Sequence, residues 1–338
     1  MINTLHSRGC ELITDLVSIP SQLRRIPITE VTIHPESDAT FVLADLPPTL
    51  NILSLNYLVP SQPPLDLTHL CSLTYLSLDG IQGPLDGAKL PESLTELYLD
   101  SFFNQPVYNL PASVTKLSLK CMVYPHKIEH RPLQKIDIHD LSSLSSNTDC
   151  PHLRELIIER VNQKDISRIT SSSFPVLEKL KTMLGSTELE EFNLSTLPAS
   201  LRMLDISHYG QMDPQSLPNG ITDLRISYDE GDTPLPNIPP NVQTLTLHGY
   251  HDKLDVSKLP QSLTSLELFS HKQQVDLEVF QQLPSLRCLA WFGSNQSDNI
   301  NHTLTIKSNK SNLSLIIKTL QESETDNNNN SNQWIHYL

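Results

Sequence analysis

Residues 90–99 read Leu-Pro-Glu-Ser-Leu-Thr-Glu-Leu-Tyr-Leu, and nearly the same order of residue types returns at 110–119 and 259–268. In each copy a leucine or valine follows Leu-Pro and opens the spacing Leu-x-x-Leu-x-Leu or its valine variant. Alternation of apolar and polar residues over so short a stretch predicts a β-strand with one buried face. A unit of this length cannot enclose a core of its own, so its neighbours must stack on it.

The same signature continues through most of the 338 residues. The first apolar residue of each copy is, in order, Leu23, Leu50, Leu73, Leu94, Val114, Leu133, Leu153, Leu177, Leu201, Ile221, Val242, Leu263 and Leu286. After an irregular first step, the copies are spaced close to the leucine-rich-repeat period of about 20–29 residues. We therefore predict an α/β-type repeat solenoid, a leucine-rich-repeat horseshoe with a parallel concave sheet and a mostly irregular, helix-poor convex side.

The chain divides according to how well it fits this repeat. Residues 1–45 fit poorly, show approximate helical spacing at their start and are predicted to form an N-terminal cap, with room for a degenerate first repeat at Leu23–Ile28. The repeats occupy residues 46–292, and residues 293–320 are expected to cap the C-terminal end. The composition of the Asn-rich tail at 321–338 predicts disorder.

Composition restricts the classes of function. The formal net charge is −14, and a surface of that sign repels nucleic acid and anionic lipid, which both require a basic face. No apolar run is long enough to cross a bilayer, and the first residues lack the hydrophobic core of a signal peptide. The 5 cysteines are scattered without a Cys-x-x-Cys pair, which indicates reduced thiols. We expect a cytoplasmic protein without nucleic-acid or membrane partners, for which a basic protein is the favoured partner.

The connector after residues 90–99 carries a second pattern. Residues 102–107 read Phe-Phe-Asn-Gln-Pro-Val and lead into Leu-Pro-Ala-Ser-Val at 110–114. With the strand before it, this stretch resembles the FNIP repeat, a leucine-rich-repeat variant of the social-amoeba type whose units read approximately Leu-Pro-x-Ser-Leu-x-x-Leu-x-Leu-Gly-x-x-Phe-Asn-Gln-Pro-Ile. One unit matches strongly in its Phe-Asn-Gln-Pro half, whereas the Leu-Pro-x-Ser half is spread along the chain, at Leu90, Leu110, Leu197 and Leu259.

The resemblance implies a repeat scaffold over about residues 46–292 in a functionally diverse family. Some members carry an F-box or kinase domain, for which this sequence shows no counterpart. Ordinary leucine-rich repeats place an asparagine after the strand, where its side chain bonds the turn. This chain has apolar residues there instead, so an apolar ladder is expected on that side of the core, at Ile81, Phe102, Met122 and Tyr209.

Two groups of polar residues contain the residue types found in catalytic or metal sites, but the sequence around them does not match such sites. His126 and His130 are spaced like paired metal ligands, yet prolines bracket their connector, and no glutamate follows the first histidine as it does in zinc-protease motifs. His248, His251 and Asp252 cluster at a predicted strand end, in a fold that offers no strained nucleophile turn of the Gly-x-Ser-x-Gly kind. We assign no catalytic, metal-binding or cofactor-binding residue and expect neither enzymatic activity nor a cofactor.

The concave face carries the remaining candidates. If the first, fourth and sixth places of each unit point inward, then the third, the fifth and the place after the last leucine face the hollow of the horseshoe. Tyr75 and Tyr98 are expected to lie side by side there, and tyrosine with flanking charge is typical of interface centres. The candidate partner-binding residues are Tyr75, Asp79, Glu96, Tyr98, Asp100 and Lys120.

Charge on this face changes sign from strand to strand, as between Glu96 and Lys116 or between Lys135 and Glu155. Such residues can pair across strands about 4.8 Å apart for roughly 0.2–1 kcal/mol each, without any partner. Ion pairing within the sheet and binding of a partner therefore both remain as explanations of the charge pattern.

Two hypotheses for function remain. The first is a non-enzymatic protein–protein interaction scaffold that binds a partner on the concave face. The alternative is a substrate-recognition subunit or effector that acts through a separate enzyme such as a ubiquitin ligase. The alternative ranks second because it needs a helical adaptor-binding motif at the N-terminus, and residues 1–22 are too short and too weakly helical for one.

Overall fold

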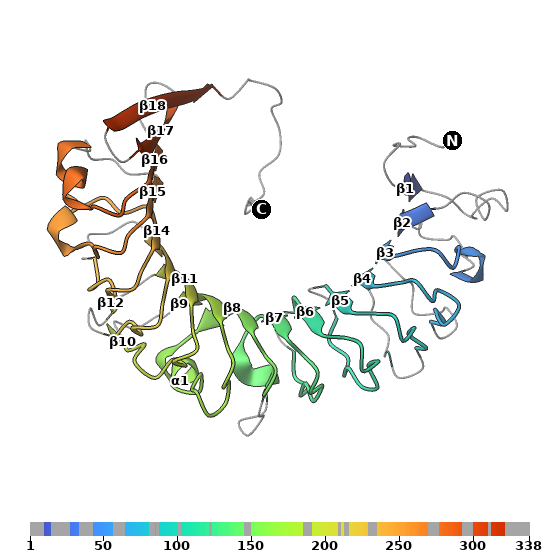
Figure 1. The fold of residues 1–338 in the computed structure, drawn as a ribbon. Helices are drawn as coiled ribbons and strands as arrows, with labels where there is room; N and C mark the ends of the chain where they lie inside the picture. The colour runs from blue at the N-terminus through green and yellow to red at the C-terminus, as the bar shows by residue number, and fades with distance from the viewer. Residues whose placement is uncertain are drawn as a thin grey trace.

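The strands of this protein stack side by side along an open arc. The computed structural model describes residues 10–14, 28–33, 43–56, 65–80, 85, 88–100, 103–121, 124–144, 150–184, 191–208, 211–212, 216–228, 235–269, 277–292, 300–309 and 312–321. Figure 1 shows the strands on the inner side of the arc and the connectors on its outer side. The predicted horseshoe is thereby confirmed.

Fourteen strands form one parallel sheet, in which spatial order follows chain order. They are β1 (Cys10–Thr14), β2 (Ile28–Ile33), β3 (Ile52–Asn56), β4 (Tyr75–Asp79), β5 (Glu96–Leu99), β6 (Lys116–Leu119), β7 (Lys135–Ile138), β8 (Glu155–Val161), β9 (Lys179–Leu184), β11 (Met203–His208), β13 (Asp223–Tyr228), β14 (Thr244–His248), β15 (Ser265–Phe269) and β16 (Cys288–Phe292). The two-residue strands β10 (Glu191–Phe192) and β12 (Gln211–Met212) pair separately, also in parallel.

Helix is scarce among the described residues, as the sequence predicts. The one α-helix there is α1 (Gln163–Ile166), and the 3₁₀ turns are η2 (Leu43–Asp45), η3 (Leu141–Ser143), η4 (Val256–Lys258) and η5 (Leu277–Gln282). Asn162 caps α1, because its side-chain oxygen accepts the backbone N–H of Asp165.

The leucines of successive strands are in register and form one continuous core. Leu97 pairs with Leu76 on one side and with Leu117 on the other. Leu94, Leu97 and Leu99 are all buried, so the first, fourth and sixth places point inward as predicted. The same holds for the fourth-place leucines along the sheet: Leu117, Leu156, Leu204, Leu224, Leu245 and Leu266 are buried.

The Leu-Pro-x-Ser motif ties three of its four units to the unit before through a serine hydrogen bond, which the copy at Ser113 lacks among the described residues. Its proline carbonyl accepts the backbone N–H three residues later, as Pro91 does from Leu94 at 3.1 Å, which closes the turn that leads into the strand. Its serine hydroxyl donates to a carbonyl of the preceding unit, from Ser93 to Leu73 at 2.7 Å and from Ser200 to Leu177 at 2.8 Å. The motif therefore supplies a hydrogen-bond ladder between units.

The Phe-Asn-Gln-Pro connector packs on the convex side of the core. Phe103 is fully buried and stacks on Tyr124 of the next unit with the ring centroids 6.4 Å apart. The Tyr124 hydroxyl accepts the backbone N–H of Val107 at 3.1 Å. Aromatic stacking and this hydrogen bond together fix one connector against the next.

The ends of the chain differ in part from the sequence-based expectations. Residues 10–14, for which helical spacing was noted, form β1, because pairing with β2 extends the sheet by a further strand. At the other end β17 (Ile300–Asn309) and β18 (Asn312–Gln321) form an antiparallel hairpin, and β17 lies against β16 (Figure 1).

Some expectations concern residues outside the described ranges. The apolar ladder at Ile81, Phe102, Met122 and Tyr209 lies outside them, as do Leu23 and the tail beyond Gln321. The division of the chain at residues 45, 292 and 320 stays a prediction.

Candidate partner-binding surface

Tyr75 on β4 and Tyr98 on β5 both face the concave side of the sheet. On both strands the side chains alternate between buried leucines and partly exposed residues, and the two tyrosines belong to the partly exposed set. They are thus half-buried and reachable from solvent, as a partner site requires.

The two tyrosines are diagonal neighbours, not directly opposite each other. Tyr75 pairs with Glu96, whereas Tyr98 lies between Ser77 on one side and Ser118 on the other. Tyr75 and Tyr98 are thus neighbours on adjacent strands, in a diagonal arrangement. The pairing register, which places the first residue of β4 opposite the first residue of β5, is the reason.

Negative charge lies near Tyr98. Burial raises the pKa of Tyr98 above its usual value, and the negative charges of Asp79, Asp100 and Asp137 raise it further, as does Tyr75. Burial also raises the pKa of Tyr75, while a hydrogen bond with Ser77 acts in the opposite direction. Both tyrosines are therefore neutral hydroxyl groups at neutral pH, with negative charge beside Tyr98.

Asp100 is more deeply buried than its expected surface position implied. Asp100 is only 5 % exposed to solvent. Neither of its carboxylate oxygens has a hydrogen-bond partner in the part of the chain that the structure describes. Its backbone N–H continues the sheet by donating to Leu78 at 3.3 Å. The concave orientation is thus kept, but the sequence pattern carried no sign of the burial, which comes from tertiary packing.

Lys120 belongs to a different group of charges from the one expected. Its ammonium lies 2.7 Å from Asp137 and 3.6 Å from Glu159, on the two strands that follow, and His139 contacts the same Glu159 at 2.8 Å. Asp137 therefore joins the two groups, since its charge also acts on Tyr98. Asp137 is the fifth place of its unit, so the rule for concave positions covers it, but it was not among the candidate residues. The signal that could have found it is its position two strands from Tyr98 in the same row of the sheet.

Glu96 and its neighbours explain much of the alternating charge. Lys116 contacts Glu96 at 2.6 Å, and Lys135 contacts Glu155 at 2.7 Å. These pairs join register neighbours on adjacent strands and are partly exposed to solvent, so each contributes modestly to the free energy of folding. Ion pairing within the sheet is thus sufficient for this part of the pattern, and no partner is needed to account for it.

Three of the histidines considered for chemistry, His126, His130 and His248, make contacts with neighbouring units. The Nε2 atoms of His126 and His130 each lie 2.8 Å from a backbone carbonyl of the preceding unit, those of Asn104 and Val114. Among the described residues no group of three or more His, Cys, Asp or Glu side chains is placed to hold a metal ion. His248 stacks on Phe269 with the ring centroids 6.1 Å apart, and burial lowers its pKa.

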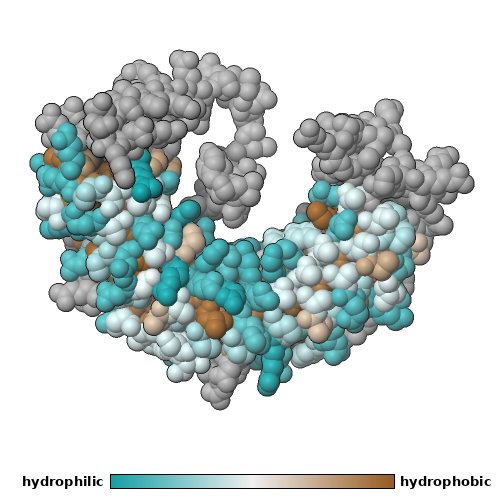
Figure 2. Space-filling model, in the orientation of Figure 1, coloured by the Kyte–Doolittle hydropathy of each residue, from teal (hydrophilic) through white to brown (hydrophobic). Residues whose placement is uncertain are grey.

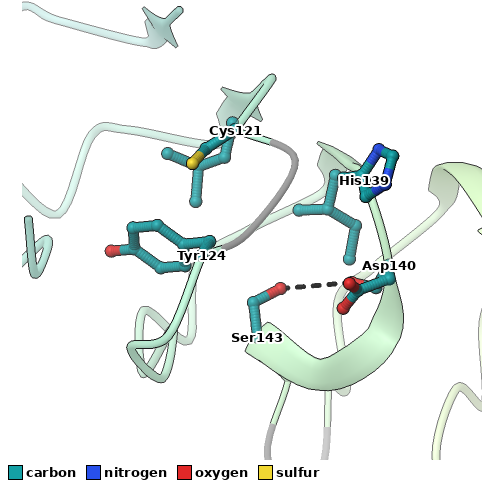
Figure 3. Close-up of a pocket in the computed structure, with 7 residues that line it drawn as sticks. Cys121, Tyr124, His139, Asp140 and Ser143 are labelled. Carbon is teal, nitrogen blue, oxygen red and sulfur yellow. Dashed lines mark hydrogen bonds between the residues drawn. The ribbon is translucent and has the colours of Figure 1, made fainter. Parts of the chain in front are cut away.

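A small recess lies between the connectors that follow β6 and β7. Figure 3 shows Cys121, Tyr124, His139, Asp140 and Ser143 around it, and the Ser143 hydroxyl donates to the backbone carbonyl of Asp140 at 3.3 Å. The recess measures about 180 Å³ including open solvent and has no space for even a water molecule. The recess therefore has no room for a ligand in this structure.

The surface in view is mainly polar. Figure 2 shows hydrophilic and intermediate colours over the described residues of this face, with small and separate apolar areas. Scattered apolar residues of this kind are ordinary on a protein surface. None of the helices that the described residues form has the length and apolar character needed to cross a bilayer.

Comparison with known proteins supports the repeat assignment. Residues 83–121 match the model of the FNIP Repeat family, which confirms the resemblance seen in the connector and the strands on either side of it. That match concerns the repeat and not a social-amoeba origin. No match was found among curated proteins.

One similar solved structure is described as CroV588, a novel circular LRR protein. Sequence identity is 19 % and the TM-score is 0.27, with 81 % of this chain and 58 % of that chain covered. This chain thus spans 58 % of the length of that protein.

Proposed function

We propose that this chain is a non-enzymatic protein-interaction scaffold that binds a partner protein on the concave face of its sheet. A repeat of the FNIP type and a parallel solenoid sheet support an interaction role, because stacked repeats present an extended concave surface. The partner is a basic protein, since the formal net charge of −14 steers basic proteins toward the chain.

The single observation that carries this proposal is the pair of half-buried tyrosines among carboxylates. Tyr75 and Tyr98 present aromatic area on the sheet, and Asp79, Asp100 and Asp137 place negative charge beside Tyr98. Aromatic side chains with flanking charge dominate the energetics of protein interfaces. The same tyrosines have no evident role in the core, which the leucines of the alternate positions fill.

The test is a capture experiment from cell lysate, followed by calorimetry with the protein that is captured. Tyr75→Ala and Tyr98→Ala should each weaken association by about 1–3 kcal/mol while leaving the melting temperature nearly unchanged. Tyr108→Ala is the matched control, because Tyr108 is 52 % exposed on a connector outside the sheet. Equal affinity of all three variants and the unchanged chain would show that the surface around Tyr75 and Tyr98 is not the binding site.

A further inference from the structure

We propose that the concave surface around Tyr98 is a receptor for an arginine side chain of the partner protein. The Tyr98 cluster consists of Tyr98, Asp100, Ser118 and Asp137. In this arrangement the guanidinium group stacks on the Tyr98 ring and donates hydrogen bonds to the two aspartates. The inference rests on the proposed function and names the chemistry of the partner.

Four side-chain oxygens of the Tyr98 cluster are buried without a hydrogen-bond partner in the described part of the chain. They are both carboxylate oxygens of Asp100, one carboxylate oxygen of Asp137 and the hydroxyl of Ser118. Buried acceptors without a donor are unfavourable and uncommon in folded proteins. A cluster of them next to the concave surface points to a donor from outside the chain, which reaches them only when the side chains above them move.

The pairing register brings these residues onto neighbouring positions of the sheet. Tyr98 pairs with Ser118, and Ser118 pairs with Asp137, so the three residues form one row across β5, β6 and β7. Asp100 directly follows the last residue of β5 and is two residues from Tyr98, so the strand alternation, if it continues, places it on the side of Tyr98. Its backbone N–H remains bonded to the sheet, which keeps this orientation.

The cluster also has an excess of negative charge that the chain itself does not neutralise. Lys120 contacts Asp137 through Oδ2 at 2.7 Å and leaves Oδ1 of Asp137 without a partner. No cation contacts the carboxylate of Asp100 among the described residues. Asp137 shares Lys120 with Glu159, and Asp100 has no such contact in the described part of the chain, so the balance of charge favours a second cation.

An arginine fits these acceptors better than a lysine does. The guanidinium is planar, carries five N–H donors, stacks on aromatic rings and loses less hydration on burial than an ammonium. Because Asp100 is only 5 % exposed, a guanidinium reaches it after a side-chain rearrangement at the surface, which is common on binding.

The first measurement is a titration with three acetylated tripeptides of sequence Gly-x-Gly, in which x is arginine, lysine or the neutral arginine analogue citrulline. Binding is followed by NMR on the intact chain labelled in its tyrosine rings, with the Tyr98 signal assigned from Tyr98→Phe. The arginine peptide should shift the Tyr98 signal saturably, the lysine peptide should bind more weakly, and the citrulline peptide should not bind. Equal binding of arginine and lysine peptides, or no shift of Tyr98 with any peptide, would overturn the proposal.

The second measurement compares Asp100→Asn with Asp223→Asn, a matched change at another concave position. Asp100→Asn should weaken arginine-peptide binding by about tenfold or more, because a charge-assisted hydrogen bond is lost. The same variant should raise the melting temperature of the free chain, because it removes a buried charge without a partner. Asp223→Asn should change peptide binding little.

The changes in peptide affinity and in melting temperature together show whether the Asp100 carboxylate binds a ligand or supports the fold. A fall in melting temperature in Asp100→Asn would show that the carboxylate supports the fold, and the arginine receptor would be wrong. If the tripeptides fail to bind while the tyrosine variants still lose the captured protein, the arginine receptor is wrong and the scaffold function stands.

Discussion

A leucine at the fourth place of each unit touches the units before and after it, so its neighbours cannot move to refill its space. Leu224 shows this position: it pairs with Leu204 on one side and Leu245 on the other, and all three are buried. Arg225, the next residue, is exposed on the concave side. Adjacent residues in one strand therefore contribute very differently to the stability of the fold.

Leu224→Ala should lower the free energy of unfolding by about 2–5 kcal/mol, because a cavity remains that the flanking leucines cannot fill. Arg225→Ala in the same strand should change it by less than about 0.5 kcal/mol. Urea unfolding followed by circular dichroism measures both values. Equal effects of the two substitutions would contradict the single buried spine.

Tyr124 gives the fold a dependence on alkaline pH. Burial raises its pKa from 10.0 to about 12, while the hydrogen bond from the Val107 backbone acts in the opposite direction. Since the pKa in the folded state lies above the value in the unfolded state, the stabilisation is fully present below pH 10 and is lost as pH rises toward about 12.

Tyr124→Phe should therefore lose less stability over this alkaline range than the unchanged chain does, although it is less stable at neutral pH because the Val107 N–H loses its acceptor. Other tyrosines also titrate at high pH, so the measured quantity is the difference between the two chains in urea midpoint at each pH. Parallel pH profiles would show that Tyr124 is not the group responsible.

At the scale of the element, the Leu-Pro-x-Ser turn acts as a connector between units as well as a start for each strand. Ser200 bonds the Leu177 carbonyl at 2.8 Å, whereas the hydroxyl of Ser113 is buried without a partner in the described part of the chain. The same motif thus occurs with and without its hydrogen bond, which offers an internal comparison.

Ser200→Ala should lower the free energy of unfolding by about 0.5–1.5 kcal/mol, the net contribution of one intramolecular hydrogen bond. Ser113→Ala should be neutral or stabilising, because the hydroxyl that it removes has no partner there. Thermal unfolding of both variants under identical conditions is the measurement. A larger loss at Ser113 than at Ser200 would show that the serine ladder does not join the units.

At the scale of the whole molecule, a stack of repeats has contacts between neighbours but an exposed core face at each end. The hairpin of β17 and β18 lies against β16 at the C-terminal end of the sheet (Figure 1). A solenoid that loses a terminal element exposes the apolar face of the unit beneath it.

Removal of residues 322–338 should leave the melting temperature nearly unchanged, because an Asn-rich segment buries too little apolar surface to offset its ordering entropy. Removal of residues 300–338, which takes away β17 and β18 as well, should lower it by several degrees. Differential scanning calorimetry of the two truncated chains and the full chain measures these melting temperatures. A large loss with the shorter truncation would show that the final residues pack on the solenoid.

The amino-acid sequence by itself determined the solenoid, the parallel sheet and which leucines form the core. A period of two along each strand and a fixed spacing between units leave one arrangement that buries every apolar position, so local pattern and global fold agree. The concave orientation of Tyr75, Tyr98 and Asp79 followed from the same alternation.

The tertiary structure decided what those concave residues contact. The register placed Tyr98 opposite Ser118 and diagonal to Tyr75. Packing buried the Asp100 carboxylate without a hydrogen-bond partner among the described residues, and Lys120 forms an ion pair with Asp137. The alternation of apolar and polar residues predicts which face of the sheet a side chain occupies. A long side chain on that face can contact any of several neighbours. That choice depends on distances and burial across three or more strands, which no single repeat encodes.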